Sequence, residues 1–317
     1  MRKGQNPAKT LNQVAKPERI TVAVLNYIPI VSGFFAEMPE VLKACLTSLR
    51  KDPGLPFDLM VFDNGSCEEV QQYLLEEQSA GRIQYLALSE KNLGKGGAWN
   101  IIFGAAPGEI VAYADNDVYF YPGWLKRSVE ILETYPRVGM VTARPFRTKL
   151  ELYTATIEWA RSTPEVQHET GQFISWESFR EFALSIEKTE QEARVLFDSS
   201  NDDRLTYRGV TAHIGASHWQ FTAYKSVMQQ FLPFDMDRPM GQVRQLDERL
   251  NAAGYLRLMV SVPLAMNMSN TPLLTSGRGS VDTPGKMSLG KRLREFPPLK
   301  ALLLRFYDRI FRWYYRD

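Results

Sequence analysis

The chain has 317 residues, of which 44% are hydrophobic and 23% are charged, and these values exclude a disordered or fibrous protein. Residues 1–19 carry a net charge of +4 and residues 286–317 carry +6, so residues 20–285 carry −8 within a total of +2. This distribution excludes a binder of duplex nucleic acid, whose positive charge would lie on the folded domain. Basic ends favour contact with an anionic surface.

The cysteines and the first residues indicate the compartment. Cys45 and Cys67 are too few for a disulfide framework, which favours a reducing environment. The segment from Met1 to Lys16 is polar and lacks the apolar run of a signal peptide. The sequence contains no run of about 18 apolar residues, so we expect no membrane-spanning helix. We therefore expect a cytoplasmic protein.

Strands and helices are predicted to alternate through the first half of the chain. Short apolar or β-branched runs predict five strands, at 20–25, 57–62, 83–88, 110–114 and 138–143. Helical spacing predicts four helices between them, at 41–50, 68–78, 95–106 and 122–135. This alternation predicts an α/β fold with a mostly parallel, doubly wound sheet, in which ligands bind beyond the carboxyl ends of the strands.

The second half of the chain shows a different pattern. Residues 144–210 are polar and rich in glutamate. The elements predicted from there on are a helix at 174–196, a strand signal from Val210 through Trp219, a helix at 242–253 and a strand at 256–262. Residues 267–290 are rich in Ser, Thr, Gly and Pro and indicate a flexible segment, and the chain from Leu299 onward is predicted to be helical.

The triplet Asp115-Asn116-Asp117 ends the fourth predicted strand. Two carboxylates one residue apart suit a hard cation such as Mg²⁺ or Mn²⁺, which fills its other positions with phosphate oxygens. An ordinary strand-ending turn is the alternative, because Asp and Asn favour turns. A phosphatase of the haloacid dehalogenase type is disfavoured, since Tyr119 stands where that motif expects Thr or Val.

Two further turns follow predicted strands. Asp63 and Asn64 follow the second strand, where a carboxylate could accept hydrogen bonds from a nucleobase, and an ordinary turn is again the alternative. The segment Asn92–Asn100 (NLGKGGAWN) brings three glycines to a helix N-terminus, where backbone N–H groups favour a pyrophosphate. It is not a Walker A loop, because no Gly-Lys-Ser/Thr follows at the required spacing.

In this order the three segments resemble the glycosyltransferase family 2 type of GT-A fold, over about residues 20–143. The resemblance implies a hexosyltransferase that moves a sugar from a nucleotide-diphosphate sugar to an acceptor hydroxyl. It implies that Asp115 and Asp117 hold Mn²⁺ or Mg²⁺ at the diphosphate. The residues that it implies for nucleotide-sugar binding are Asn26, Tyr27, Asp63, Asn64, Asn92, Gly94, Lys95, Asn100, Asp115 and Asn116.

The resemblance is looser on the acceptor side. The family's Glu-Asp pair, which supplies the catalytic base of inverting enzymes, is replaced by Gln242-Val243. On the predicted helix, Asp247 borders the apolar face while Glu248 faces away, so Asp247 is the expected base. Its rivals are Asp235 and Asp237, and a surface salt bridge is the structural alternative. A retaining mechanism also stays open.

Other acceptor-side and metal-site candidates follow from the same resemblance. His218 and Trp219 are expected to line the acceptor pocket, with simple packing as the alternative. Some GT-A enzymes use a late histidine as a third metal ligand, and this chain offers Asn267 and Asn270 there instead.

The predicted C-terminal helix is amphipathic. Four arginines form one narrow stripe beside an aromatic and aliphatic face: Arg305, Arg309, Arg312 and Arg316. This pattern is typical of a helix that lies on an anionic membrane, here the inner face. Docking on the catalytic domain or in a homodimer is the alternative. An inactive GT-A domain that serves as a membrane-associated binding module is the second alternative function.

The predicted partners are a nucleotide-diphosphate sugar and a glycan or lipid-linked acceptor, and no nucleic acid. The predicted division of the chain is a mobile tail at 1–19, a nucleotide-sugar-binding half at 20–143, an acceptor-binding half at 144–266, and a flexible segment with the amphipathic helix at 267–317.

Overall fold

The structure is a computed structural model that describes residues 4, 6–10, 14–186, 188–237, 243–272 and 309. Residues 1–272 form one compact unit, and residues 273–317 form a second, of which a single residue is described. The predicted C-terminal helix and most of the predicted flexible segment therefore lie outside the described residues. Among the described residues, no helix is long and apolar enough to cross a membrane.

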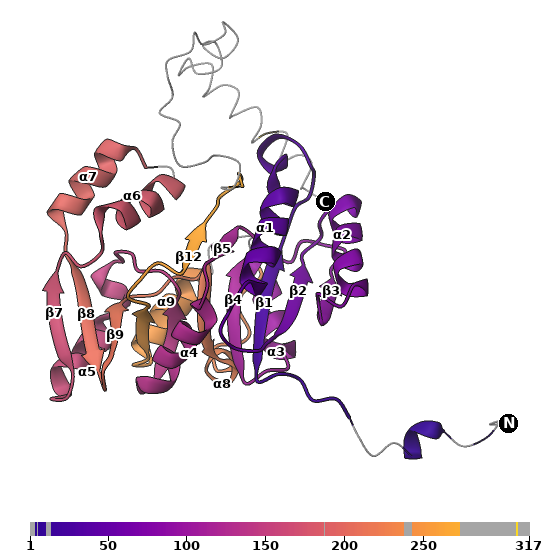
Figure 1. Ribbon diagram of the computed structural model, residues 1–317, viewed down its shortest axis with the longest axis horizontal. Helices are drawn as coiled ribbons and strands as arrows, with labels where there is room; N and C mark the ends of the chain where they lie inside the picture. The colour runs from indigo at the N-terminus through magenta and orange to yellow at the C-terminus, as the bar shows by residue number, and fades with distance from the viewer. Residues whose placement is uncertain are drawn as a thin grey trace, which may run out of the picture. The chain divides into compact units, whose positions relative to one another are not determined.

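In the described part of the first unit, twelve strands form two sheets (Figure 1). In chain order the strands are β1 (Ile20–Asn26), β2 (Asp58–Asp63), β3 (Tyr85–Leu88), β4 (Ile110–Asp115), β5 (Val118–Phe120), β6 (Val138–Thr142), β7 (Gln167–Gly171), β8 (Asp202–Tyr207), β9 (Val210–Ile214), β10 (Gln220–Tyr224), β11 (Leu256–Met259) and β12 (Ala265–Asn267). Ten of them form one sheet in the order β3-β2-β1-β4-β10-β6-β11-β9-β8-β7, and β12 pairs with β5.

Most strands of the large sheet run in one direction. β1 is parallel to β2 and β4, β2 is parallel to β3, and β6 is parallel to β11. β10, β9 and β7 run against the others and interrupt the parallel order in the second half of the chain. The predicted α/β class with a mostly parallel sheet is therefore confirmed, and the antiparallel strands β9, β8 and β7 extend that sheet beyond β11.

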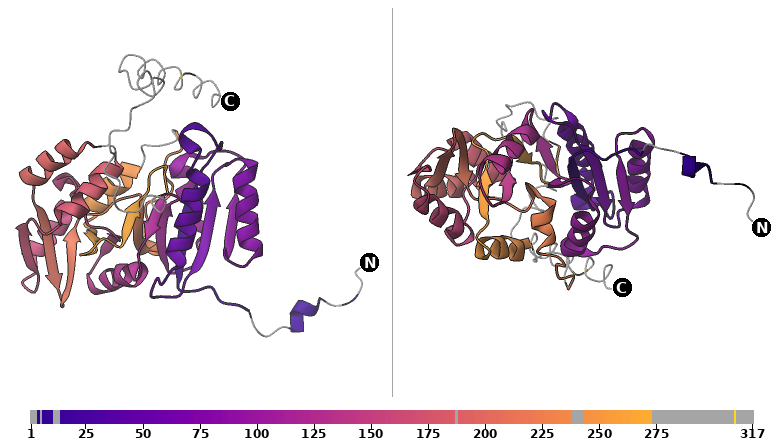
Figure 2. Two further views of the ribbon diagram at one scale, coloured as in Figure 1. Left: turned by 45° about the horizontal axis from the view of Figure 1, so that its top comes forward. Right: turned by 90° about the horizontal axis from the view of Figure 1, so that it is seen from below.

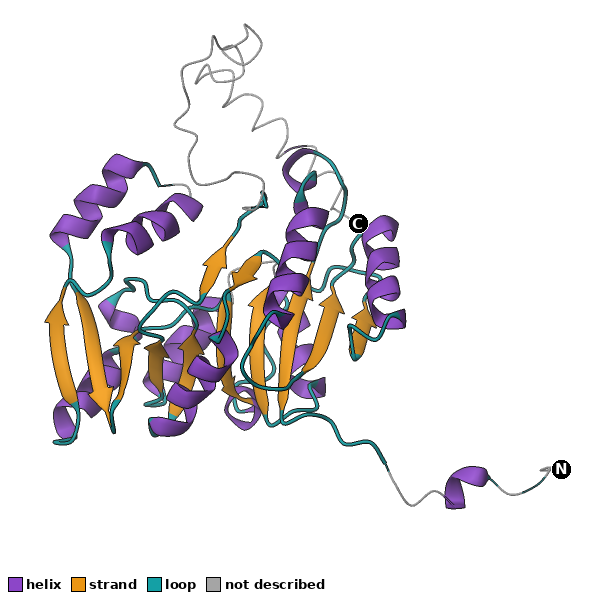
Figure 3. Cartoon of the chain, viewed as in Figure 1, coloured by secondary structure: helices purple, strands orange, loops and turns teal. Residues whose placement is uncertain are grey.

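Helices cover both faces of the large sheet (Figures 2 and 3). They are α1 (Met38–Arg50), α2 (Glu68–Ser79), α3 (Gly94–Ala105), α4 (Trp124–Thr134), α5 (Thr154–Ser162), α6 (Trp176–Ser185), α7 (Glu190–Ser199), α8 (Lys225–Gln229) and α9 (Val243–Ala252), with short 3-10 turns at Pro7–Thr10, Gly33–Phe35 and Leu150–Leu152. One hydrophobic core cluster joins α3, α8 and α9 to one sheet face, with Trp99, Phe103, Tyr113 and Phe221 at its centre. Neighbouring residues of β1 alternate between this cluster and the opposite face, which explains its unbroken apolar run.

Two sequence predictions in the second half are wrong. The single helix predicted over 174–196 is two helices, because Ser175 caps α6 and Thr189 starts α7 with a capping box to Glu192. The strand signal predicted through Trp219 ends at Ile214, and residues 215–219 form the connection to β10. Gly215 has φ +122, outside the range of an ordinary strand, and this interrupts the extended backbone.

The parallel strands end at one edge of the sheet, which is the upper edge in Figure 1, and the N-terminal segment enters β1 at the opposite edge. The residues after β1, β2 and β4 therefore lie together. The connection 215–219 reaches the same edge, because the amide N–H of Asp115 donates to the carbonyl of Trp219 (2.9 Å).

Candidate functional site

The ends of β1 and β2 form a buried network of polar side chains. Asn26 and Asp63 are register partners, and Asn26 Nδ2 donates to Asp63 Oδ1 (2.7 Å) and to Ser66 Oγ (3.0 Å). Asn116 Nδ2 donates to Asn26 Oδ1 (2.7 Å), which joins the end of β4 to the network. Ser66 N and Gln71 Nε2 donate to Asp63 Oδ2. The structure thus brings three of the predicted donor-site residues together and holds their orientation.

Ser66 and Gln71 were missed by the sequence analysis. Ser66 lies three residues after Asp63, the spacing of a side-chain turn, and this was the available signal. Tyr27 follows the network, and its ring packs edge-on against Phe35 with the centroids 6.3 Å apart.

A second network ties the glycine-rich segment to the end of β2. Asn64 Nδ2 donates to Asn92 Oδ1 (3.0 Å), and the amides of Leu93 and Gly94 donate to Asn64 Oδ1 and Asn92 Oδ1. Gly94 has φ +68, a left-handed conformation that favours glycine at the start of α3. The structure therefore brings together Asn64, Asn92 and Gly94, three of the residues that the resemblance implies for nucleotide-sugar binding.

Gly96, Gly97 and Asn100 on α3 contact the loop of residues 234–236. A Cβ on Gly96 would lie 2.4 Å from the carbonyl oxygen of Asp235, and a Cβ on Gly97 would meet Met236. Asn100 Nδ2 donates to the carbonyl of Phe234 (3.0 Å), whose amide donates back to Asn100 Oδ1 (2.7 Å). This face of α3 therefore holds the 234–236 loop, and the Asn100 side chain is engaged with the backbone of Phe234.

The two carboxylates of the Asp115–Asp117 segment have different surroundings. Asp115 Oδ2 accepts from Lys95 Nζ (2.7 Å) and its Oδ1 accepts from the Tyr113 hydroxyl (2.5 Å). Asp117 Oδ2 lies 3.4 Å from Asn267 Nδ2, whereas Asp117 Oδ1 is buried and has no hydrogen-bond partner among the described residues. Burial, followed by the nearby charge of Asp115, raises the pKa of Asp117 to about 7.

These residues fit a divalent cation. An orphaned, buried carboxylate oxygen is a costly feature unless a cation binds it, and carboxylate oxygen is the ligand that Mg²⁺ and Mn²⁺ prefer. No group of three His, Cys, Asp or Glu side chains gathers as a metal cage within the described part of the chain. The arrangement suits a cation that takes its other ligands from a substrate, with Asp117 as the better-placed ligand because both oxygens of Asp115 already have donors.

The segment after β12 closes this part of the site. Met268 N donates to the carbonyl of Asp117 (2.7 Å), and Ser269 N donates to Asn267 Oδ1. Asn270 Nδ2 donates to the carbonyl of Phe34 (3.1 Å). Of the two asparagines predicted at the family's late-histidine position, Asn267 contacts Asp117 and Asn270 contacts the loop after β1.

The acceptor-side candidates lie on α9, β11 and the 215–219 connection. The Asp247 side chain is 6% exposed, and its Oδ1 accepts from Nη2 of the fully buried Arg257 (2.5 Å). His218 Nδ1 lies 3.3 Å from Asp247 Oδ2. Glu248 is exposed and pairs with Arg244, so the two acids point to different faces of α9 as the helical spacing predicted. Arg257 was missed, because nothing in the strand pattern marks an arginine as buried.

Trp219 and the rival acids complete this side. Trp219 is buried, and its ring stacks on that of Phe182 with the ring centroids 6.5 Å apart. Its indole N–H has no hydrogen-bond partner among the described residues. Asp235 and Asp237 are exposed in the loop before α9. Neither joins the Asp247 cluster in the contacts of the described residues.

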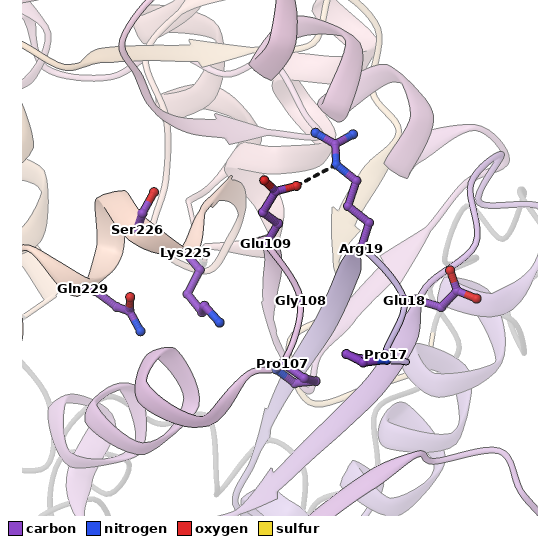
Figure 4. A pocket seen from close by; sticks show the side chains of 9 residues that line it. All are labelled: Pro17, Glu18, Arg19, Pro107, Gly108, Glu109, Lys225, Ser226 and Gln229. Atoms are coloured by element: carbon purple, nitrogen blue, oxygen red, sulfur yellow. Dashed lines mark hydrogen bonds and ion pairs between the residues drawn. The ribbon is translucent and has the colours of Figure 1, made fainter. Parts of the chain in front are cut away.

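A hollow of about 380 Å³ lies at the opposite edge of the sheet (Figure 4). Arg19 pairs there with Glu109, and Lys225, Ser226 and Gln229 of α8 line the other side. None of the predicted site residues lies in its lining. The carboxyl edge, where the polar networks meet, is therefore the candidate site.

A comparison of the sequence with models of protein families shows the family to which the chain belongs. The model described as "Glycosyl transferase family 2" matches residues 30–188, about half of the chain. The chain belongs to glycosyltransferase family 2. The resemblance seen in the sequence is thereby confirmed, and with it the GT-A type of α/β fold. The matched range contains Asp63, Asp115 and Asp117 and ends before His218 and Asp247, so these two acceptor-side candidates of this family 2 chain lie outside the family match.

Individual relatives are more distant. An uncharacterized glycosyltransferase of Nostoc sp. is 29% identical over 125 residues, which are 39% of this chain and 35% of that protein. TarS 1-349 of S. aureus in complex with UDP-GlcNAc is a similar solved structure, with TM-score 0.46, 14% identity, and coverage of 77% of this chain and 56% of TarS 1-349. The mannosyltransferase PcManGT of Pyrobaculum calidifontis, in complex with GDP-Man and Mn²⁺, has TM-score 0.45, 16% identity, and coverage of 79% of this chain and 56% of that one. The chain thus spans little more than half of these solved structures and about a third of the Nostoc protein.

Proposed function

We propose that this family 2 chain transfers a sugar from a nucleotide-diphosphate sugar to an acceptor hydroxyl, with inversion and with a divalent cation. The observation that carries the proposal is the orphaned Oδ1 of Asp117 at the carboxyl edge of the sheet, beside the Asp115–Lys95 pair and the buried Asn26–Asp63 network. A cation ligand, a lysine and polar groups after parallel strands are what a charged nucleotide requires.

The residues of the donor side have separate tasks in this proposal. Asp117 holds Mn²⁺ or Mg²⁺, which neutralises the leaving diphosphate when it is bound. The Lys95 side chain is buried, and its ammonium group forms an ion pair with Asp115. In this proposal the same ammonium group lies beside the leaving diphosphate. Asp63 and Asn64 are buried and bonded within the chain, so their task in this proposal is to fix the shape of the turn that receives the nucleoside end.

The acceptor side must take up a proton as the new glycosidic bond forms. The sequence points to Asp247 for this task, and in the structure Asp247 lies beside Arg257 and His218. Inversion requires one displacement at the anomeric carbon, with the acceptor on the side opposite the diphosphate.

A screen of melting temperature with nucleotide sugars, with and without Mn²⁺, tests the proposal. A ligand that binds the folded state alone raises the melting temperature. UDP-GlcNAc and GDP-mannose are the first probes. We expect a shift for one donor that depends on Mn²⁺, and slow Mn²⁺-dependent hydrolysis of that donor with an inverted anomeric product. Binding without hydrolysis would favour an inactive binding module, and a retained anomer would favour a retaining enzyme.

The location and the acceptor belong to the same proposal. The arginine stripe and apolar face predicted for residues 299–317 support a cytoplasmic protein held at the inner face of the membrane. A lipid-linked or glycan acceptor is reached from that position. A homodimer formed through the same helix is the competing use of this segment.

A further inference from the structure

Asp247 has little capacity left to act on an acceptor. Arg257 donates a hydrogen bond to Asp247 Oδ1, and His218 Nδ1 lies 3.3 Å from Asp247 Oδ2. Arg257 is itself held by the carbonyls of Leu152 (2.7 Å) and Ala216 (2.8 Å), so this ion pair is locked between β11, α9 and the 215–219 connection. A carboxylate with both oxygens engaged and a 6% exposed side chain is poorly placed to meet a sugar hydroxyl.

His218 is the accessible member of the same cluster. Its side chain is 36% exposed, and no partner is recorded for its Nε2 in the described part of the chain. Its neighbour Trp219 accepts the Asp115 amide N–H at the end of β4. The imidazole is therefore one residue from a backbone contact with the donor-side carboxylates.

The tautomer follows from the contact with Asp247. A carboxylate accepts and does not donate, so the Nδ1 that faces Asp247 carries the proton and Nε2 carries the lone pair. An imidazole oriented in this way by a buried carboxylate is a general base with a fixed direction.

We propose that His218 is the catalytic base of this chain and that Asp247 is its positioning residue. The inference rests on the proposed function. The acceptor O–H gives its proton to His218 Nε2 while the acceptor oxygen bonds to the anomeric carbon. The bond from that carbon to the diphosphate oxygen breaks, and its electron pair leaves with the diphosphate. Asp247 stabilises the imidazolium through Nδ1–H, and the proton then passes to solvent.

The test measures hydrolysis of the nucleotide sugar that shifts the melting temperature, with water as the acceptor and Mn²⁺ present. His218→Gln is expected to lower kcat about 100-fold or more with the donor KM unchanged. His218→Ala is expected to lose the same activity and to regain part of it in millimolar imidazole, which a purely structural role would not allow. Asp247→Asn is expected to lower kcat without rescue by imidazole.

Two matched controls accompany these variants. His168→Gln removes a histidine that also pairs with an aspartate, Asp203 (2.9 Å), on the outer antiparallel pair of strands β7 and β8. Glu248→Gln removes the acid next to Asp247 on the exposed face of α9. Both are expected to keep the wild-type rate and KM.

The outcomes separate the inference from the proposed function. A wild-type rate in His218→Gln together with a large loss in Asp247→Asn would overturn the inference and leave Asp247 as the base. A loss in His218→Ala without imidazole rescue, with a raised donor KM, would also overturn it. If no nucleotide sugar shifts the wild-type melting temperature, the proposed function fails first, and the inference fails with it.

Discussion

The unequal surroundings of Asp115 and Asp117 are the main chemical feature of the site. Lys95 and Tyr113 satisfy Asp115, so its negative charge is balanced within the chain. Asp117 has one oxygen without a partner among the described residues and a pKa raised by burial to about 7. A carboxylate that is destabilised in the free protein is stabilised when a cation binds, and part of its cost in folding is recovered as affinity.

Removal of Asp117 should therefore abolish function without loss of the fold. We expect Asp117→Ala to reduce Mn²⁺-dependent donor hydrolysis by about two orders of magnitude or more, because a bound metal contributes several kcal/mol to the transition state. The Mn²⁺-dependent melting shift should disappear, while the melting temperature in EDTA should not fall. Full activity of this variant, or of the wild type in excess EDTA, would rule out the metal role.

The pKa of Asp117 also predicts a pH dependence of stability. Between pH 4 and 7 the folded metal-free protein retains a proton that the unfolded chain has released, so the free energy of unfolding falls as the pH rises. Asp117→Asn removes the titrating carboxyl group and with it this decrease in the free energy of unfolding. In EDTA its melting temperature should match that of the wild type near pH 4 and exceed it at about pH 8. Equal melting temperatures across this range would show that the carboxylate is not destabilised.

Among the elements, the start of α3 joins the two halves of the site. Its first turn is fixed to the end of β2 through Asn64 and Asn92, and Lys95 reaches Asp115 on β4. Gly96 and Gly97 allow the 234–236 loop to lie on the helix, and that loop precedes α9. The glycines expected to admit a pyrophosphate thus include two that admit the 234–236 loop, Gly96 facing the backbone of Asp235 and Gly97 the side chain of Met236.

Two glycines of this helix offer a matched comparison. Gly96→Ala would place a methyl group 2.4 Å from the carbonyl oxygen of Asp235 and should lower the free energy of unfolding by about 1–3 kcal/mol. Gly104→Ala meets no atom within 4 Å and should raise it by about 0.5–1 kcal/mol, because alanine loses less backbone entropy in a helix. Urea unfolding measures both. Equal effects of the two substitutions would show that the loop does not press on Gly96.

Buried arginines organise the acceptor side at the same scale. Arg144 donates to the carbonyl of Ser178, to Glu181 and to the carbonyl of Ala265, which joins α6 to β12. Arg257 joins Asp247 to the 215–219 connection. Where these irregular segments pack together, buried guanidinium groups take the place of apolar side chains. Each guanidinium group can donate to several backbone carbonyls at once.

At the scale of the whole molecule, charge is separated between an acidic body and basic ends. Replacing Arg305, Arg309, Arg312 and Arg316 by glutamine in the full chain should weaken binding to anionic vesicles, by about 1 kcal/mol for each arginine. High salt should weaken wild-type binding in part, because the apolar face of the predicted helix is not screened. Cosedimentation with vesicles measures this effect.

The basic residues of the N-terminal tail provide the control. Replacing Arg2, Lys3, Lys9 and Lys16 by glutamine removes the same charge from a segment without an apolar face. This variant should keep most of the vesicle binding, and both variants should keep donor hydrolysis. Equal loss in the two variants would show that net charge alone, and not an amphipathic helix, binds the surface.

The sequence by itself determined the α/β class, the order of the first strands and helices, and the position of the polar residues that follow these strands. This succeeded because parallel strands are local apolar runs whose carboxyl ends share one edge, so Asp63, Asn92 and Asp115 are brought together by topology alone. Helical spacing likewise separated Asp247 from Glu248.

Tertiary structure alone decided the pairings across the second half of the chain. The sequence could not show that Arg257 neutralises Asp247, that His218 is left accessible, or that Asn100 binds the Phe234 backbone, because each contact joins segments whose separation in the chain carries no periodic signal. The antiparallel strands β7 and β8 are partly exposed and polar, so no apolar run marked them. Local patterns predict elements, whereas the partner of a buried charge is fixed by the packing of elements that are distant in sequence.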